Sequence, residues 1–220
     1  MPAAPRRSNS ERRDESQGRI LDAAEALFAQ SGFNGVSVKD IAGAAKVDTS
    51  LIHYYFGSKA GLFTAVIQRY APRVNQARMD SMAAYARTAG DGLNLEGVLR
   101  AYLEPAFRIA IDGGQSEQNY MRLIAQVSVA PPSAMAGVEV TAFDPVIEAF
   151  IALLHQARPA ATRTDLYWFY HLLSGAITHS WARTGRIDRL SGGLCRSDDL
   201  AQILEEMVQL YAGHPLGARS

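Results

Sequence analysis

The sequence predicts an all-α protein, and two observations lead to this fold class. Apolar residues recur at intervals of three and four positions over long segments, which is the spacing of one face of an α-helix. Glycines and prolines interrupt these segments, as at Gly113-Gly114 and Pro131-Pro132, where helices are expected to end. We therefore expect two successive helical regions, one over 16–63 and a larger one over 64–213. Short tails would flank them at 1–15 and 214–220.

The first 15 residues are rich in Pro, Arg and Ser and have no apolar periodicity, so we expect this tail to be disordered. Its arginines could reach a DNA groove or the phosphate backbone, or they could belong to a solvated leader; they are Arg6, Arg7, Arg12 and Arg13. From Ser16 onward an apolar pattern predicts the first helix, which Gly32 closes.

The segment from Ser37 to Leu62 predicts two short helices joined by a tight turn. Ser37 is a favourable N-cap, and Asp40 three residues later completes a variant of the capping box. Asp48 is the next N-cap and begins the second helix. Two helices joined by about three to four residues form the helix-turn-helix unit.

The second of these helices, about Thr49 to Phe56, has two different faces. One face carries the side chains that can anchor it to a core, namely Ile52, Tyr55 and Phe56. The rest of the helix is free of Asp and Glu and offers mostly uncharged hydrogen-bonding groups, from Thr49, Ser50, Leu51, His53 and Tyr54. Such groups suit base edges and phosphates, although an ordinary packed helix pair is the alternative interpretation.

The residues from Val47 to Lys59, followed by Leu62-Phe63, resemble the signature of TetR-family transcriptional regulators. The resemblance extends back to Ile20 and covers about a fifth of the chain. It implies an all-helical homodimer, with a three-helix helix-turn-helix DNA-binding domain over 16–63 and a ligand-binding and dimerisation domain over 64–213. It also implies DNA contacts at the positions of Ser37, Lys39, Thr49, Ser50, Leu51, His53, Tyr54 and Lys59. Among these, Lys39, His53 and Lys59 would hold phosphates. The chain departs from the family at His53, where a Tyr that contacts phosphate is usual.

The amino-acid composition is compatible with DNA binding but does not by itself indicate it. The formal net charge is zero, but residues 1–60 hold eight Arg and Lys against seven Asp and Glu, and all three lysines lie within the expected DNA-binding unit. The single cysteine, Cys195, excludes an internal disulfide framework and suits a reducing cytoplasm, where we expect the protein to act. We see no secretory signal and no membrane-spanning segment, so no membrane partner is expected.

The remaining helices are interrupted by Pro72, which should kink or restart one helix, and by Pro105. Irregular packing of this kind favours a pocket for a small hydrophobic or aromatic effector. Candidate lining residues are aromatic or imidazole side chains of the middle helices: Tyr85, Tyr102, Phe107, Tyr120, Phe143, Phe150, Trp168 and His171. Plain core packing is the alternative for each of them.

The last two long helices carry strong apolar stripes. The first stripe contains Leu166, Phe169, Tyr170, Leu173, Ile177 and Trp181, and the second contains Leu200, Ile203, Leu204, Met207 and Tyr211. The family resemblance implies that these helices pair with their mates in a four-helix dimer interface. An intramolecular core is the alternative.

The sequence offers no catalytic constellation. Glycine-rich phosphate loops and the common zinc and nucleophile motifs are absent, so we expect no enzyme, no cofactor and no metal. The preferred function is a repressor that a small molecule releases from a pseudo-palindromic double-stranded DNA operator. The competing functions are a helical adaptor and a small-molecule-binding protein that no longer binds DNA.

Overall fold

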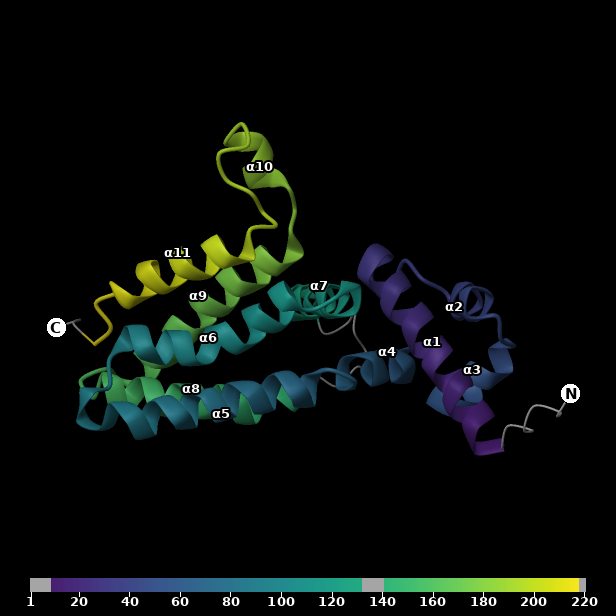
Figure 1. Ribbon diagram of the computed structural model, residues 1–220, viewed down its shortest axis with the longest axis horizontal. Coiled ribbons are helices and arrows are strands. Elements are labelled where there is room, and N and C mark those ends of the chain that lie inside the picture. Colours follow the sequence, from purple (N-terminus) through teal and green to yellow (C-terminus); the bar gives the residue numbers. More distant parts are fainter. Residues whose placement is uncertain (1–8, 132–140, 218–220) are drawn as a thin grey trace, which may run out of the picture. The chain divides into compact units, whose positions relative to one another are not determined.

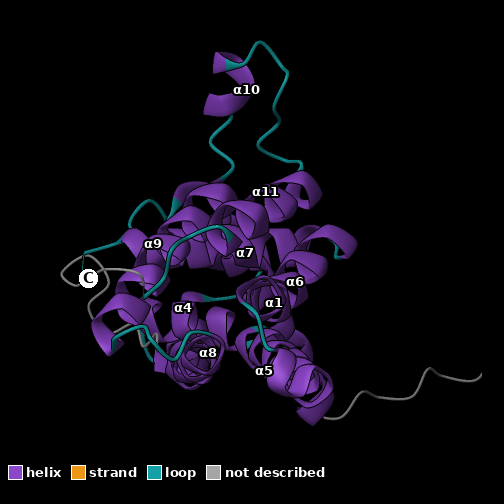
Figure 2. Ribbon diagram, turned by 90° about the vertical axis from the view of Figure 1, so that its left-hand side faces the viewer, coloured by secondary structure: helices purple, strands orange, loops and turns teal. Residues whose placement is uncertain are grey.

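A computed structural model describes residues 9–131 and 141–217. The described residues contain helices and loops but no strand, which confirms the all-α fold class (Figure 2). They divide into two compact units, of which the first is formed by residues 9–69 and 130–131 and the second by residues 70–129 and 141–217. No helix among these residues combines the length and apolar character needed to cross a bilayer.

The first unit contains four helices, α1 (Asn9–Ser31), α2 (Val38–Ala45), α3 (Thr49–Phe56) and α4 (Lys59–Gln68) (Figure 1). Its core draws fully buried side chains from each helix, among them Phe28, Ile41, Ile52 and Phe63. Phe63 meets Phe28 edge to face at a centroid distance of 4.9 Å. The core therefore fixes α2 and α3 against α1 and α4 and leaves their opposite faces open.

Two limits of the first unit differ from the expectation. α1 begins at Asn9, so residues 9–15 are helical and the expected disordered tail is wrong for them, while residues 1–8 lie outside the described part. The expected domain boundary at 63/64 falls inside α4, whose buried Val66 and Ile67 complete the core, and the first unit runs to Arg69. Apolar periodicity missed the start of α1 because its first turns are polar and exposed.

The second unit contains the longer helices (Figure 1). They are α5 (Ala71–Ala89), α6 (Leu95–Asp112), α7 (Gln115–Val129), α8 (Asp144–Ala157), α9 (Arg163–Ala182), α10 (Arg186–Leu190) and α11 (Leu200–Ala212), with short 3-10 turns η1 (Gly90–Gly92) and η3 (Thr141–Phe143). Pro72 lies in the first turn of α5, so the chain restarts a helix there, as expected from its missing N–H. Pro105 lies inside α6.

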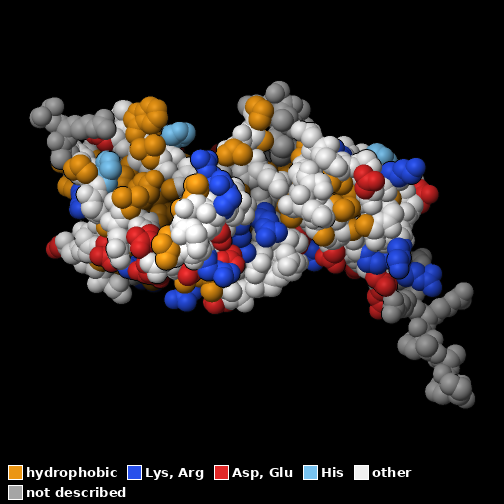
Figure 3. All heavy atoms as spheres, turned by 90° about the horizontal axis from the view of Figure 1, so that it is seen from above, with side chains coloured by type: hydrophobic (Ala, Val, Ile, Leu, Met, Phe, Trp, Pro, Cys, Tyr) orange, Lys and Arg blue, Asp and Glu red, His pale blue; other side chains and the backbone are white. Residues whose placement is uncertain are grey.

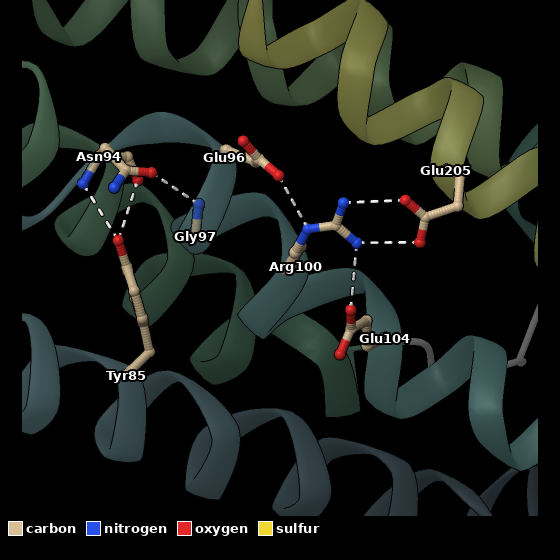
Figure 4. Close-up of polar contacts among 7 residues, drawn as sticks. All are labelled: Tyr85, Asn94, Glu96, Gly97, Arg100, Glu104 and Glu205. Carbon is tan, nitrogen blue, oxygen red and sulfur yellow. Dashed lines mark hydrogen bonds and ion pairs between the residues drawn. The ribbon is translucent and has the colours of Figure 1, made fainter.

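Polar contacts join the N-terminal half of α6 to α5 and α11 (Figure 4). The Arg100 guanidinium of α6 donates to both carboxylate oxygens of Glu205 on α11, at 2.9 and 2.8 Å, and to Glu96 at 3.0 Å. The Tyr85 hydroxyl of α5 accepts from the Asn94 backbone N–H at 3.1 Å, next to the start of α6. Gly97 lies under the Tyr85 ring, where an added Cβ would come 2.1 Å from Cζ, so this close approach requires glycine.

The apolar stripes of α9 and α11 face the interior of the second unit, which corrects the dimer assignment for most of their residues. Leu166, Phe169, Leu173, Ile177 and Trp181 are buried, as are Leu200, Leu204 and Met207. The other three, Tyr170, Ile203 and Tyr211, are half-buried. A helix that serves a core and an interface needs two apolar faces, and here the stronger one forms the core.

The expected C-terminal tail is also partly structured. His214 contacts the Phe169 ring at 5.6 Å between centroids, and Leu216 is buried. The second unit therefore continues beyond residue 213, at least as far as Gly217, which lies against Ala161.

Candidate nucleic-acid interface and effector cavity

Side-chain caps fix both helices of the helix-turn-helix segment. The Ser37 hydroxyl accepts from the Asp40 N–H at 3.1 Å, and the Asp40 carboxylate accepts from the Ser37 N–H at 2.9 Å, which completes the capping box. The Asp48 carboxylate accepts from the Ser50 N–H at 2.8 Å and begins α3 at Thr49. These hydrogen bonds hold the pKa of each carboxyl group, Asp40 and Asp48, below its usual range.

The two faces of α3 differ as the sequence indicates. Ile52 is fully buried, while Thr49, Ser50, His53 and Tyr54 are exposed, Tyr54 with 73% of its surface. Ser50 and Tyr54 are therefore free to meet another molecule. Leu51 is half-buried.

The Lys59 ammonium makes contacts within the first unit. It donates to the backbone carbonyls of Phe33 and Val36, each at 2.9 Å, and lies 4.4 Å from the centroid of the Phe33 ring. These contacts tie the start of α4 to the α1–α2 connection. Lys59 was expected to contact phosphate, but two of its three N–H donors already bind backbone carbonyls, so the side chain also has a structural role.

The other expected DNA contacts lie around α3. Ser37 is exposed, but its hydroxyl also donates to Asp40 at 2.6 Å, so it is committed to the cap. Lys39 is exposed on α2. His53 Nδ1 lies 3.2 Å from the Gly57 carbonyl oxygen. If Nδ1 donates that hydrogen bond, Nε2 is left for an outside partner.

The second unit contains a partly open cavity of about 330 Å³ between its helices. Its wall combines apolar, aromatic and polar side chains from α5, α6, α7, α8 and α9: Val74, Arg78, Tyr102, Tyr120, Met121, Ile124, Val127, Ser128, Phe143, Asp144, Ile147, Tyr170, Ser174, Ile177, Thr178 and Trp181. The volume lies at the lower end of the range of small-molecule sites, about 300–1,000 Å³.

Of the eight residues expected to line a pocket, the cavity brings together Tyr102, Tyr120 and Phe143. The structure places the other five elsewhere. Tyr85 bonds to Asn94 at the α5–α6 connection, and Phe107 and Phe150 are fully buried beside the cavity wall. Trp168 and His171 are exposed on α9. The aromatic character of a residue alone does not distinguish a side chain that lines the cavity from one that packs in the core.

Sequence reasoning missed the buried arginine of this cavity. Arg78 follows Val74 and precedes Met82 at intervals of four, so it occupies the apolar face of α5 and is 5% exposed. A charged residue at a core position was the available signal. Three further lining residues, Tyr170, Ile177 and Trp181, had been expected in the dimer interface.

The outward face of α9 and α11 is apolar. Trp168 and Leu172 on α9 are 61% and 57% exposed, and Leu210 on α11 is 73% exposed. Figure 3 looks onto this face and shows hydrophobic side chains gathered over α11 and α9. The segment 183–199, which carries α10, projects beyond these helices as an arm, and its Leu194 is 91% exposed (Figure 1). We call this surface the α9–α11 face.

No group of three or more His, Cys, Asp or Glu side chains among the described residues is placed to hold a metal ion. Cys195 is an exposed thiol in the arm.

Comparisons with known proteins match both units. Residues 20–66 match the family described as bacterial regulatory proteins, tetR family, and residues 100–213 match the tetracyclin repressor-like C-terminal domain. The chain is 39% identical over 64 residues to the transcriptional repressor NicS of Pseudomonas putida, which is 29% of this chain and 30% of that protein. It is 29% identical over 135 residues to the transcriptional activator FasR of Mycolicibacterium smegmatis, 61% of this chain and 57% of that protein. These matches thus span less than two thirds of either relative.

A solved structure of a TetR-like transcriptional regulator from Rhodococcus sp. RHA1 is similar over most of the chain. Its TM-score is 0.60 at 25% sequence identity, and the similarity covers 95% of this chain and 100% of that one. The helical architecture of both units therefore has a counterpart among solved proteins.

Proposed function

Because the chain belongs to the TetR family, we propose that it is a DNA-binding transcriptional repressor whose α3 enters the major groove. The observation that carries this proposal is the exposed, uncharged, hydrogen-bonding face of α3, held from behind by the fully buried Ile52. Hydroxyl and imidazole groups on such a helix suit base edges and phosphates. An adaptor with a purely structural helix pair would be expected to cover Ser50 and Tyr54, and both are exposed.

Three positively charged or hydrogen-bonding groups then divide into two roles. Lys39 on α2 and His53 on α3 contact phosphates, because both side chains are exposed within the helix-turn-helix segment. Lys59 positions the unit by holding the α1–α2 connection through the Phe33 and Val36 carbonyls.

The functional protein is a homodimer, and we infer that a second copy covers the α9–α11 face. A monomer seldom exposes such large apolar side chains as Trp168, Leu172 and Leu210 along one surface. A two-fold dimer would present two copies of α3 to a pseudo-palindromic operator with half-sites about 34–36 Å apart, or a multiple of this distance.

The cavity of the second unit holds the effector. A ligand that prefers the dimer state whose recognition helices do not match the operator spacing would release the protein from DNA. The size of the effect is limited by the difference in the ligand's affinity for the two states.

Operator binding by a Tyr54→Ala variant tests the DNA assignment. A direct base contact contributes about 1–3 kcal/mol, so operator affinity should fall about fivefold or more. Tyr167→Ala is the matched control, because Tyr167 lies on α9 in the second unit. Fluorescence anisotropy with DNA from upstream of the gene measures both variants. Equal operator affinity for Tyr54→Ala and wild type would remove Tyr54 from the interface.

A further inference from the structure

The cavity contains a buried positive charge without a negative partner. Arg78 is 5% exposed, its Nε donates to the Tyr102 carbonyl at 3.1 Å, and its guanidinium lies 4.4 Å from the centroid of the Tyr102 ring. Among the described residues it forms no ion pair, and its two terminal amino groups have no hydrogen-bond partner. Buried arginines are normally paired, because an uncompensated charge is costly to remove from water.

Two more unsatisfied donors line the same cavity. The Tyr120 hydroxyl and the Trp181 indole N–H are buried and have no hydrogen-bond partner among the described residues. Burial raises the pKa of Tyr120, so its hydroxyl keeps the proton that it can donate. The Arg78 guanidinium also lies 6.0 Å from the centroid of the Trp181 ring. Polar groups buried without partners are rare, and two of them beside a guanidinium that has no ion pair point to a missing acceptor.

The remaining wall limits what that acceptor can be. Apolar side chains from four helices surround the donors, including Val74, Ile124, Ile147 and Ile177. The acid of the wall, Asp144, is exposed and forms no ion pair with Arg78. One unpaired cation balances one negative charge, and a planar guanidinium matches the two oxygens of a carboxylate.

We propose that this cavity binds a small monocarboxylic acid with an apolar body, whose carboxylate pairs with Arg78 and accepts hydrogen bonds from Tyr120 and Trp181. The identification of this ligand class rests on the proposed role of the second unit as an effector domain. A neutral apolar molecule would leave all three donors without partners, and a dianion would bring a second charge that the described cavity wall does not balance.

The test uses Trp181 as a reporter in the full-length chain. The chain has two tryptophans, and Trp168→Phe removes the exposed one, so fluorescence then reports on the cavity. Phenylacetate and octanoate are titrated beside their matched neutral amides, phenylacetamide and octanamide. We expect at least one carboxylate to quench or shift Trp181 fluorescence and to bind at least tenfold more tightly than its amide. The proposal is overturned if neither carboxylate binds, or if the amides bind equally well.

Arg78→Met separates the charge from the shape of the cavity. In the Trp168→Phe background it should weaken carboxylate binding at least tenfold and leave amide binding unchanged. Replacing an unpaired buried charge by an apolar side chain of similar length should not unfold the protein, and the melting temperature checks this. Unchanged carboxylate affinity in Arg78→Met would overturn the proposal.

A second variant keeps the test decisive should Arg78→Met fail to fold. Tyr120→Phe removes only the unpartnered hydroxyl, and we expect it to weaken carboxylate binding about threefold or more. An unchanged carboxylate affinity in this variant would count against the proposed site. Operator binding is measured separately on the wild-type chain, without carboxylate, because Trp168 lies on the proposed dimer face. Loss of operator binding with intact carboxylate binding refutes the proposed function alone, and the reverse result refutes this inference alone.

Discussion

Replacing Lys59 by Met should lower the stability of the first unit without removing a contact between the protein and DNA phosphates. The change removes two hydrogen bonds to the carbonyls of Phe33 and Val36 and the contact with the Phe33 ring at 4.4 Å. Lys39→Met is the matched control, because Lys39 is exposed on α2 and an exposed substitution changes stability by about 0.5 kcal/mol at most.

The expected loss of stability follows from these contacts. Hydrogen bonds to a charged donor contribute roughly 1.5–3 kcal/mol each. Lys59 is only part-buried, so water can replace the donor at both carbonyls, and each bond then contributes about half of that value. The cation–π contact adds roughly 0.5–1 kcal/mol. The side-chain freedom regained on mutation offsets about 1 kcal/mol. We therefore expect Lys59→Met to lower the opening free energy of the first unit by about 2 kcal/mol.

Native-state hydrogen exchange of peptides from α1 and α4 measures this free energy, and peptides from the second unit serve as an internal reference. Operator affinity as a function of salt gives the second readout. Loss of one phosphate contact reduces the slope of log affinity against log salt by about one. Lys39→Met should show this reduction and Lys59→Met should not. A Lys59→Met variant of unchanged stability but reduced slope would refute the positioning role.

Two further predictions concern the turn after α3 and the dimer. Gly57→Ala should destabilise the first unit by about 1–2 kcal/mol, because Gly57 has a φ of +72°, although no atom would crowd an added Cβ. Gly43→Ala is the control: Gly43 is helical and equally open, so this change should stabilise the unit by about 0.5–1 kcal/mol. Hydrogen exchange that ranks the two variants the other way would contradict this prediction. Leu210→Glu should convert the dimer to monomers in sedimentation experiments, because it places a charge in the proposed interface. Val129→Glu changes an equally exposed apolar residue at the end of α7 and should leave the dimer intact. A dimeric Leu210→Glu variant would exclude the α9–α11 face as the dimer interface.

The sequence predicted the helix-turn-helix segment closely because short-range chemistry determines it. Ser37 and Asp48 cap α2 and α3 as expected, and α3 spans the predicted Thr49–Phe56. Capping depends on residues two or three positions away, so no knowledge of the tertiary fold is needed.

The second unit was less predictable because its apolar stripes have two possible partners. The stripe through Leu173 and Ile177 could face a core or a second subunit, and amphipathicity is the same in both cases. Arg78 was missed for a related reason. Only the fold shows that this charge lies among apolar side chains, next to Tyr120 and Trp181. A cavity is a property of long-range packing, which residue spacing does not describe.

Selection of bound fragments from random double-stranded DNA by the purified full-length protein tests the central claim most directly. The proposed arrangement of two α3 helices predicts recovery of an inverted repeat, with half-sites one helical turn or a multiple of it apart. A Ser50→Ala, Tyr54→Ala double variant should lose this enrichment. Recovery of no preferred sequence by the wild-type protein, or the same repeat by the double variant, would contradict the assignment of α3 as the DNA-reading helix.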